Sequence, residues 1–320
     1  MDRLLRAASQ LNKILIYYPI GSSMDNFLNL AFRPISIDDR SSFLMALEKD
    51  PPEISEFTFT NLYAWRLAYK FEAVFVNELM LLRSLSGPEP RYFVPIGRGD
   101  KAGIMEQALS ASNGSFIRVP GSVAKSLDAE IFILEPDRDN FDYLYRMADL
   151  VSLKGKTYDG KRNSIRKFKA SYKYEYVELN AMNARECLDF EESWCVMKDC
   201  DKIASLGSER DALKEMLVNF DLLNLEGAVL KVGEKICAMA LGEALSPGTM
   251  VLHILKADAS KDGSYQVMLR DFLSRRAERF EYLNMEQDLG LEGLRRSKLS
   301  YGPCRMIDKY TIRIRGGRSR

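Results

Sequence analysis

Residues 249–303 decide the fold, and they read TMVLHILKADASKDGSYQVMLRDFLSRRAERFEYLNMEQDLGLEGLRRSKLSYGP. The first eight residues are largely apolar and include β-branched side chains, which predicts a strand over 249–256. The small polar residues that follow suit a turn and a helix N-cap at Ser264. Apolar residues then recur every three or four positions as far as Arg276, which predicts a helix, and residues 280–286 predict a second strand.

A strand, a helix and a second strand of these lengths form a crossover unit, which places the two strands parallel. It brings the helix N-terminus and the carboxyl ends of the strands to one edge of the sheet, where backbone N–H groups hold anions. Gly290 then allows a short helix over 291–300 that returns toward this edge. The polar residues expected to converge there are Asn284, Glu286, Asp288, Arg295 and Lys298.

The composition is that of a soluble globular protein. The chain has 320 residues, 46% of them apolar, and its mean hydropathy is −0.22. This length accommodates two domains of ordinary size. No run of apolar residues approaches the roughly 20 needed to span a bilayer, and the start Met-Asp-Arg lacks a signal-peptide pattern. We therefore expect a cytoplasmic protein without a transmembrane segment.

The cysteines and the histidine limit the chemistry. There are five cysteines, with no Cys-x-x-Cys pair, and a single histidine, His253. This pattern favours neither a disulfide framework nor a zinc site, so we expect reduced structural thiols and no metal. Without a histidine near them in the sequence, Cys195 and Cys200 are poor candidates for nucleophiles.

Positive charge is concentrated in one segment, although the formal net charge of the chain is only +1. Residues 154–173 contain eight Lys or Arg and one Asp. Such a segment could clamp phosphate groups, and the residues predicted to do so are Lys161, Arg162, Asn163 and Lys167. The alternative is a solvated segment between two domains.

The order of the remaining predicted elements indicates the fold class. The second half comprises a strand at 174–179, helices at 183–198 and 208–219, and strands at 226–232, 235–245 and 249–256. Followed by the crossover, this is the order of the acetyltransferase-type (GNAT) fold. Residues 32–153 show a looser version, in which 137–145 lead into a helix that ends at Leu153.

We therefore predict an α/β (α+β) protein with two tandem acetyltransferase-like domains. Each domain should have a mixed, mainly antiparallel sheet with flanking helices. The predicted divisions are an N-terminal extension at 1–31, a first domain at 32–153, a basic junction at 154–173 and a second domain at 174–320.

Several short motifs occur together in the chain. They are Phe32-x-Pro34, Ser55-Glu-Phe-Thr-Phe-Thr-Asn-Leu-Tyr-Ala-Trp65, Asp142-Tyr-Leu-Tyr145, Leu153-Lys-Gly-Lys156, Lys161-Arg-Asn163, Gly293-Leu-Arg-Arg-Ser-Lys298, Pro303 and Tyr310. With these motifs the chain resembles proteins related to the C-terminal domain of phosphatidylglycerol lysyltransferase, over nearly its whole length from residue 32.

The resemblance implies a tandem acetyltransferase-type fold, as in the lysyltransferases and the peptidoglycan peptide-bridge transferases. It also implies transfer of an aminoacyl group from tRNA to an amine or hydroxyl acceptor. Because the sequence contains no long apolar run, we expect no counterpart here of the membrane-spanning half of the lipid-modifying enzymes. Its turn Lys261-Asp-Gly-Ser264 departs from the Arg/Gln-x-x-Gly-x-Gly/Ala loop of coenzyme-A-dependent acetyltransferases.

Three residues are the candidate catalytic groups. Glu286 and Asp288 could accept a proton from an attacking amine; the alternative is that they cap the next helix or pair with Arg295 and Lys298. Lys298 continues an apolar helix face, so its ammonium must reach solvent, a carboxylate or an anionic ligand. The resemblance favours a ligand, such as the reacting carbonyl or a donor phosphate.

The candidate binding residues cluster around the crossover. Gly263, Ser264 and Tyr265 begin a helix and could cradle a phosphate, or they could form a plain N-cap. Asn284 and Arg295 belong to the same predicted edge. His253 lies in mid-strand and is expected to pack in the core; the alternative is contact with substrate.

The function that follows is transfer of an acyl or aminoacyl group by direct attack of an acceptor amine or hydroxyl, without a covalent enzyme intermediate. The donor would be aminoacyl-tRNA or acyl-coenzyme A, with no tightly bound cofactor, and the acceptor a small or lipid-like molecule. The alternative is a non-catalytic protein of the same fold that binds an anionic ligand in the groove between its domains.

Overall fold

A computed structural model describes residues 30–316 except 77 and 199, so most of the predicted extension at 1–31 lies outside the described residues. The chain forms two compact units. Of the described residues, the first contains those at 30–51, Arg66–Asp137 and those at 308–316. The second contains Pro52–Trp65 and Arg138–Ile307.

The first unit is built on a mixed sheet with the strand order β1-β2-β3-β4-β6-β15-β7, and β5 pairs with β3. Its strands are β1 (Arg33–Pro34), β2 (Phe71–Val76), β3 (Leu79–Ser84), β4 (Arg91–Tyr92), β5 (Ile96–Gly97), β6 (Ser115–Pro120), β7 (Phe132–Pro136) and β15 (Lys309–Ile314). Its helices are α3 (Arg40–Lys49), α5 (Arg66–Tyr69), α6 (Lys101–Ala111) and α7 (Gly121–Ala124).

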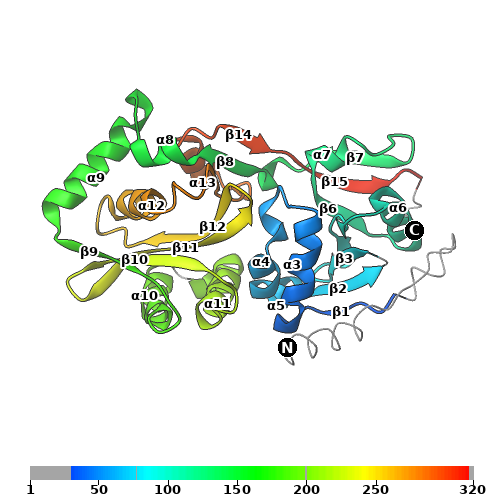
Figure 1. Ribbon diagram of the computed structural model, residues 1–320, viewed down its shortest axis with the longest axis horizontal. Coiled ribbons are helices and arrows are strands. Elements are labelled where there is room, and N and C mark those ends of the chain that lie inside the picture. Colours follow the sequence, from blue (N-terminus) through cyan, green and yellow to red (C-terminus); the bar gives the residue numbers. More distant parts are fainter. Residues whose placement is uncertain (1–29, 77, 199, 317–320) are drawn as a thin grey trace, which may run out of the picture. The chain divides into compact units, whose positions relative to one another are not determined.

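The second unit holds a sheet with the strand order β14-β8-β13-β12-β11-β10-β9. Its strands are β8 (Asp142–Arg146), β9 (Tyr174–Glu178), β10 (Glu226–Val232), β11 (Lys235–Ser246), β12 (Thr249–Ala257), β13 (Tyr282–Asn284) and β14 (Arg305–Ile307). Its helices are α4 (Phe59–Ala64), α8 (Met147–Ser152), α9 (Asp159–Ser171), α10 (Cys187–Lys198), α11 (Ala204–Val218), α12 (Ser264–Ser274) and α13 (Glu292–Leu299). Within this unit, α12 and α9 lie on one side of the sheet and α10 and α11 on the other (Figure 1).

The predicted crossover unit is confirmed. β12 and β13 are parallel, and their pairing ends at Val251 and Asn284. β13 stops there while β12 continues to Ala257, so the two strands part beyond this pair. The apolar face of α12, including Met268 and Phe272, is fully buried against the sheet, as the spacing of these residues predicts.

Two strands lie in a different sheet from the one that their position in the sequence suggests. Residues 142–146, which the sequence leaves without secondary structure ahead of a helix, form β8 and pair with β13 and β14 of the second unit. β15, near the end of the chain, pairs with β6 and β7 of the first unit. The compact units therefore divide the chain at other positions than the predicted domains at 32–153 and 174–320.

The cysteine prediction needs one correction. Cys195 and Cys200 form a disulfide, so the expectation that every thiol is reduced is wrong for this pair. The physical reason is the turn from α10 into the 3-10 helix Cys200–Lys202, which brings the two Cα atoms to 5.0 Å. Of the helices in the described ranges, none combines the length and the apolar character needed to cross a bilayer.

Candidate functional site

A β-bulge in β12 sets the orientation of His253. Ile254 pairs with Leu241 of β11 and Leu252 pairs with Gly242, so His253 is an extra residue between the two pairs. A Cβ on Gly242 would lie only 2.3 Å from the carbonyl oxygen of Val251, which explains the glycine. Bulges of this kind redirect side chains and are frequent next to active sites.

The His253 side chain lies between two carboxylates. Nδ1 is 2.9 Å from Oε1 of Glu286, and Nε2 is 2.9 Å from Oε1 of Glu243. The imidazole is 1% exposed. Burial alone would lower its pKa, but the hydrogen bonds that the ring donates to the two carboxylates outweigh burial and raise the pKa to about 9. His253 is therefore a cation at neutral pH, and both its N–H groups donate.

Glu286 lies just beyond the end of β13, where the two parallel strands part. Its backbone is left-handed, with φ of 57°, a conformation that is costly for a side chain of this kind and is typical of functional sites. Its carboxylate also accepts a hydrogen bond from Nδ2 of Asn61 on α4, at 3.1 Å. The Glu286 side chain is 22% exposed, so a substrate could approach it.

A buried hydrogen-bond network holds the Glu286 backbone in place. Oδ1 of Asn284 accepts from the Glu286 N–H at 2.8 Å, and Nδ2 of Asn284 donates to Asp142 at 3.0 Å. Asp142 also accepts from the backbone N–H of Ser55 at 2.8 Å and from Nε2 of Gln287 at 2.9 Å. Asn284 and Asp142 are fully buried, so this network fixes one conformation of the segment.

Lys298 lies behind this segment. Its ammonium donates to the carbonyl oxygen of Gln287 at 2.5 Å and to that of Met285. These two carbonyls flank Glu286 in the chain, and Lys298 itself is 8% exposed. The structure therefore places the predicted catalytic lysine against the backbone that presents Glu286.

Asp288 forms ion pairs with two arginines, Arg295 and Arg138. Arg295 contacts it with two donors, at 2.9 and 2.8 Å, and Arg138 contacts it at 3.1 Å. The Tyr143 hydroxyl donates to it at 2.5 Å and the Gly290 N–H at 2.9 Å. Burial would raise its pKa, but these hydrogen bonds, chiefly that from Arg295, hold the pKa well below the usual range. A carboxylate of such low basicity is a weak proton acceptor, and the pairing with Arg295 is the alternative that the sequence left open.

The predicted phosphate cradle lies against α9. Gly263 has φ of 92°, and a Cβ there would lie 2.3 Å from the Ser164 carbonyl oxygen of α9. The Ser264 hydroxyl donates to the Asp258 carbonyl at 3.3 Å. Tyr265, in the first turn of α12, is half-buried, and burial raises the pKa of its hydroxyl to about 12.

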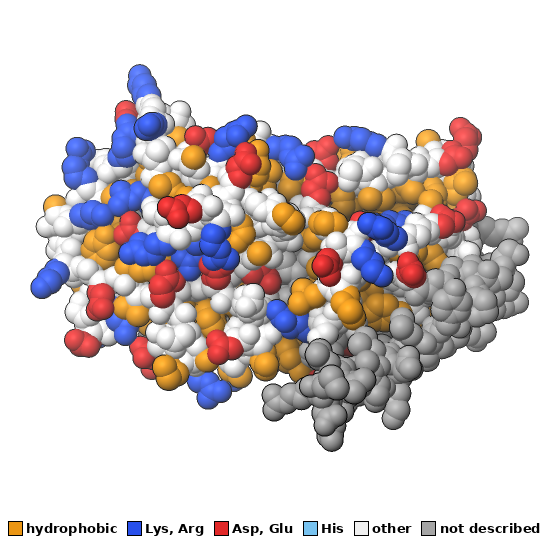
Figure 2. Space-filling model, viewed as in Figure 1, with side chains coloured by type: hydrophobic (Ala, Val, Ile, Leu, Met, Phe, Trp, Pro, Cys, Tyr) orange, Lys and Arg blue, Asp and Glu red, His pale blue; other side chains and the backbone are white. Residues whose placement is uncertain are grey.

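Lys161 has its ammonium 2.6 Å from the Ser300 hydroxyl and 4.4 Å from the centre of the Tyr301 ring. Burial lowers the pKa of this lysine. Lys167, two turns further along α9, is exposed. Figure 2 shows Lys and Arg side chains projecting along the outer edge where Figure 1 places α9.

Arg162 and Asn163 are engaged within α9 and the turn before it. Arg162 donates to the Gly155 carbonyl at 2.8 Å and also contacts Asp159. The amide oxygen of Asn163 accepts from Arg166 at 2.8 Å. These contacts hold Arg162 and Asn163 at the start of the helix, although the Arg162 side chain is still 43% exposed.

Sequence reasoning missed two members of the site, Glu243 and Asn61. Glu243 is the one charged residue of the apolar run at 237–245, directly after Gly242, and a lone carboxylate in such a strand is a usable signal. Asn61 belongs to the motif at 55–65, where it is one of several polar residues among the aromatic ones and has no signal of its own.

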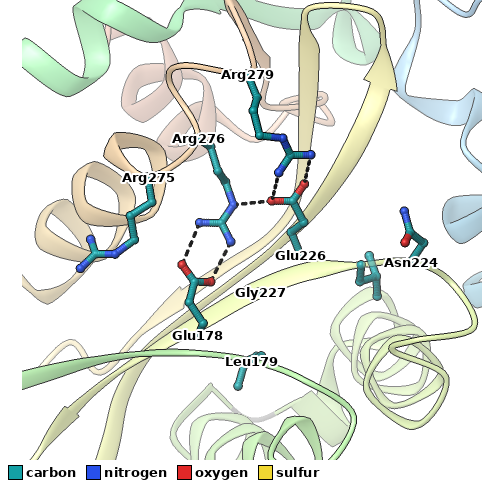
Figure 3. Close-up of a pocket in the computed structure, with 9 residues that line it drawn as sticks. Glu178, Leu179, Asn224, Glu226, Gly227, Arg275, Arg276 and Arg279 are labelled. Carbon is teal, nitrogen blue, oxygen red and sulfur yellow. Dashed lines mark hydrogen bonds and ion pairs between the residues drawn. The ribbon is translucent and has the colours of Figure 1, made fainter.

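A separate pocket of about 460 Å³ opens at the C-terminal end of α12 (Figure 3). Arg276 lies at its centre and donates to Glu178 at 2.8 Å and to Glu226 at 2.9 Å, and Arg279 makes a second pair with Glu226. Arg275 points away from this group and stacks on the Tyr176 ring. Because its charged groups satisfy one another, we assign this pocket a structural role.

The model of the family "Phosphatidylglycerol lysyltransferase, C-terminal" matches residues 51–313. The chain therefore belongs to the phosphatidylglycerol lysyltransferase C-terminal family, as its motifs suggest. A search of curated proteins finds no match.

Solved structures confirm the fold. A conserved protein of unknown function from Bacteroides thetaiotaomicron is 32% identical, covers 89% of this chain and 100% of its own, and superposes with a TM-score of 0.82. L-PGS from Bacillus licheniformis is 15% identical over 88% of this chain and 93% of its own, with a TM-score of 0.61. FemX is 8% identical, and the alignment covers 89% of this chain and 98% of FemX, with a TM-score of 0.55. The last two likenesses show the fold, with its two mixed sheets and flanking helices, in agreement with the predicted tandem arrangement.

Proposed function

We propose that the protein transfers an aminoacyl group to an amine or hydroxyl acceptor and that Glu286 is the proton acceptor. The observation that carries this proposal is the placement of Glu286. Its partly exposed carboxylate is held by His253 and Asn61 where β12 and β13 part. Membership of a family named for lysyl transfer to phosphatidylglycerol supports the reaction class.

The reaction requires one proton transfer to the enzyme. The acceptor nitrogen or oxygen attacks the carbonyl carbon of the donor ester while Glu286 takes the proton that the nucleophile loses. The tetrahedral intermediate then collapses, the bond to the ester oxygen breaks, and the proton passes from Glu286 to the leaving hydroxyl. His253 orients the Glu286 carboxylate before attack, because it donates a charge-assisted hydrogen bond to Oε1 of that carboxylate.

Two features favour aminoacyl-tRNA over acyl-coenzyme A as donor. The turn before α12 lacks the glycine-rich loop of coenzyme-A-dependent enzymes, and Gly263 is in close contact with the backbone of α9. The exposed basic side chains of α9, including Arg166 and Lys167, suit the phosphates of a nucleic acid. A lipid-like acceptor is supported only by the name of the family, and a small-molecule acceptor is the other class to test.

The test is a transfer assay with total aminoacylated tRNA and, in parallel, acetyl-coenzyme A, against a panel of amines, hydroxyl compounds and anionic lipids. Formation of a new amide or ester by the wild-type chain, lost in Glu286→Gln, supports the proposal. Retention of charged tRNA on a filter without transfer to any acceptor would favour the non-catalytic alternative. Release of thiol from acetyl-coenzyme A alone would overturn the choice of donor.

A further inference from the structure

A second charged cluster lies on the same strand as His253. The Lys256 ammonium, on β12, is 2.6 Å from Oε1 of Glu191 on α10 and 2.7 Å from Oε1 of Glu209 on α11. It also lies 3.9 Å from the centre of the Trp194 ring. Lys256 and Glu191 are buried, so this ion pair ties both helices to the strand that carries His253.

The Cys195–Cys200 disulfide lies directly beside this cluster. Sγ of Cys195 is 3.5 Å from Oε1 of Glu191, the oxygen that holds Lys256. The other oxygen of Glu191 is buried without a hydrogen-bond partner in the described part of the chain, and burial raises the pKa of this carboxyl despite the opposing effect of Lys256. A buried carboxylate oxygen without a hydrogen-bond donor raises the free energy of the folded state. A rearrangement that brings a donor to this oxygen would therefore be favourable.

The disulfide also lies directly before the start of α11. It joins the end of α10 to the 3-10 helix at 200–202, and the Ile203 N–H donates to the Cys200 carbonyl at 3.2 Å immediately before α11 begins. α11 supplies Glu209 to Lys256, and it packs against α4, which supplies Asn61 to Glu286. One covalent bond therefore supports both the Lys256 cluster and one wall of the Glu286 site.

We propose that Cys195 and Cys200 are a redox modification site and that their reduction loosens the support of the Glu286 site. A dithiol reductant supplies two electrons and two protons: its thiolate attacks one sulfur, its second thiol resolves the mixed disulfide, and two protein thiols and an oxidised reductant result. The reduced Cys195 thiol can donate to Glu191, while α11 loses its covalent tether. The activity part of this proposal rests on the proposed function, and the structural part does not.

The other three cysteines are free thiols, so they can be distinguished from the Cys195–Cys200 disulfide in an experiment. Burial raises the pKa of Cys187 to about 12 and that of Cys237 to about 11, so both are unreactive thiols. Cys304 is exposed. Cys195 and Cys200 are both buried, so we expect reduction to be slow and to require local opening.

The first experiment counts thiols. Protein unfolded in an alkylating reagent without reductant should carry three labels, on Cys187, Cys237 and Cys304, and five after prior reduction. Peptide mapping should find the two additional labels on Cys195 and Cys200. Five labels in protein that has been equilibrated with an oxidised dithiol buffer would overturn the proposal.

The second experiment reads the cluster without an activity assay. The chain has two tryptophans, so in a Trp65→Phe background the emission reports on Trp194 beside Lys256. Reduction should change this emission and speed amide exchange in α11. Cys195→Ser/Cys200→Ser should show the reduced spectrum without reductant and no further response, and Cys304→Ser should respond like the parent. If Trp65→Phe or the double variant fails to fold, amide exchange of the reduced wild-type chain decides alone, and unchanged exchange in α11 would refute the proposal.

The third arm uses the transfer assay. Reduction should slow transfer in the wild-type chain and in Cys304→Ser, and leave Cys195→Ser/Cys200→Ser unaffected. If thiol counting and emission behave as expected but no donor is ever used, the redox site stands and the proposed function fails. If transfer occurs at the same rate in both redox states, the proposed function stands and the regulatory link is refuted.

Discussion

Nδ1 of His253 lies 2.9 Å from Oε1 of Glu286, although 33 residues separate them in the chain. The imidazole donates, the carboxylate accepts, and Glu243 holds the opposite ring nitrogen. Because of these two contacts, a measured pKa of His253 shows whether both carboxylates are in place.

We expect the imidazole of His253 to titrate with a pKa of about 9. Because it is the only histidine, its NMR signals in the chain without an affinity tag require no assignment. Glu286→Gln should lower this pKa, because it removes one of the two carboxylates. A pKa near 6.5 in the wild-type protein would contradict the observed arrangement.

The same shift predicts how stability depends on pH. The folded pKa is above the unfolded value of 6.5, so the stabilisation by His253 is complete below about pH 6.5 and is lost as the pH rises through about 9. The free energy of unfolding should therefore fall from pH 6.5 to pH 9 by an amount of order 3 kcal/mol. His253→Gln should flatten this part of the profile, and an unchanged slope would contradict the prediction.

Glu286→Gln should reduce transfer by about 10²- to 10⁴-fold, the usual contribution of a general base. The amide keeps the size of the side chain, so the fold should be retained. Glu292→Gln is the matched control, since Glu292 is 82% exposed on α13 and should keep full activity. Equal rates in the two variants would exclude Glu286 as the proton acceptor.

Lys298→Met should destabilise the protein by about 1–3 kcal/mol, because one buried and one partly buried carbonyl lose a donor. Arg296→Met, two residues away with a side chain 74% exposed, should change stability by less than about 0.5 kcal/mol. Denaturant unfolding compares the two. Full stability of Lys298→Met together with lost transfer would instead return Lys298 to the ligand-binding role that its motif suggests.

Gly242→Ala should unfold the bulge, because the new Cβ would lie 2.3 Å from the Val251 carbonyl oxygen. We expect a lower melting temperature and a changed His253 titration. Gly293→Ala serves as control: a Cβ there meets nothing within 4 Å, and alanine in a helix is stabilising by about 0.4–1 kcal/mol. Equal melting temperatures would show that the bulge is not strained by a side chain at 242.

The exposed basic face of α9 predicts salt-dependent binding of tRNA. Arg166→Ala/Lys167→Ala should weaken binding and lower the slope of log affinity against log salt by about one unit for each residue. Filter binding across a salt series measures both quantities. An unchanged slope would show that α9 is the solvated segment that the sequence left as the alternative.

The sequence alone determined the crossover and the fold class, because these depend on local periodicity. Met268 and Phe272 are buried as their spacing predicts, and β12 and β13 are parallel as a strand, helix and strand of these lengths require. The motifs at 161–163 and 293–298 likewise indicated the family, because they are contiguous in the chain.

The tertiary structure alone decided which strands share a sheet and which polar groups meet. The sheets to which β8 and β15 belong depend on pairing with strands far away in the sequence, which no local pattern specifies. The contact of Glu243 and Glu286 with His253 depends on a one-residue bulge, which changes the face of the sheet on which a side chain lies. Gly242 and Glu243 are local signals near this bulge, but they do not specify which residues meet there. The sequence around Lys298 is compatible with contact to a ligand or to a backbone carbonyl. The backbone conformation of residues 285–287 decides between them, because it brings two carbonyl oxygens to the Lys298 ammonium.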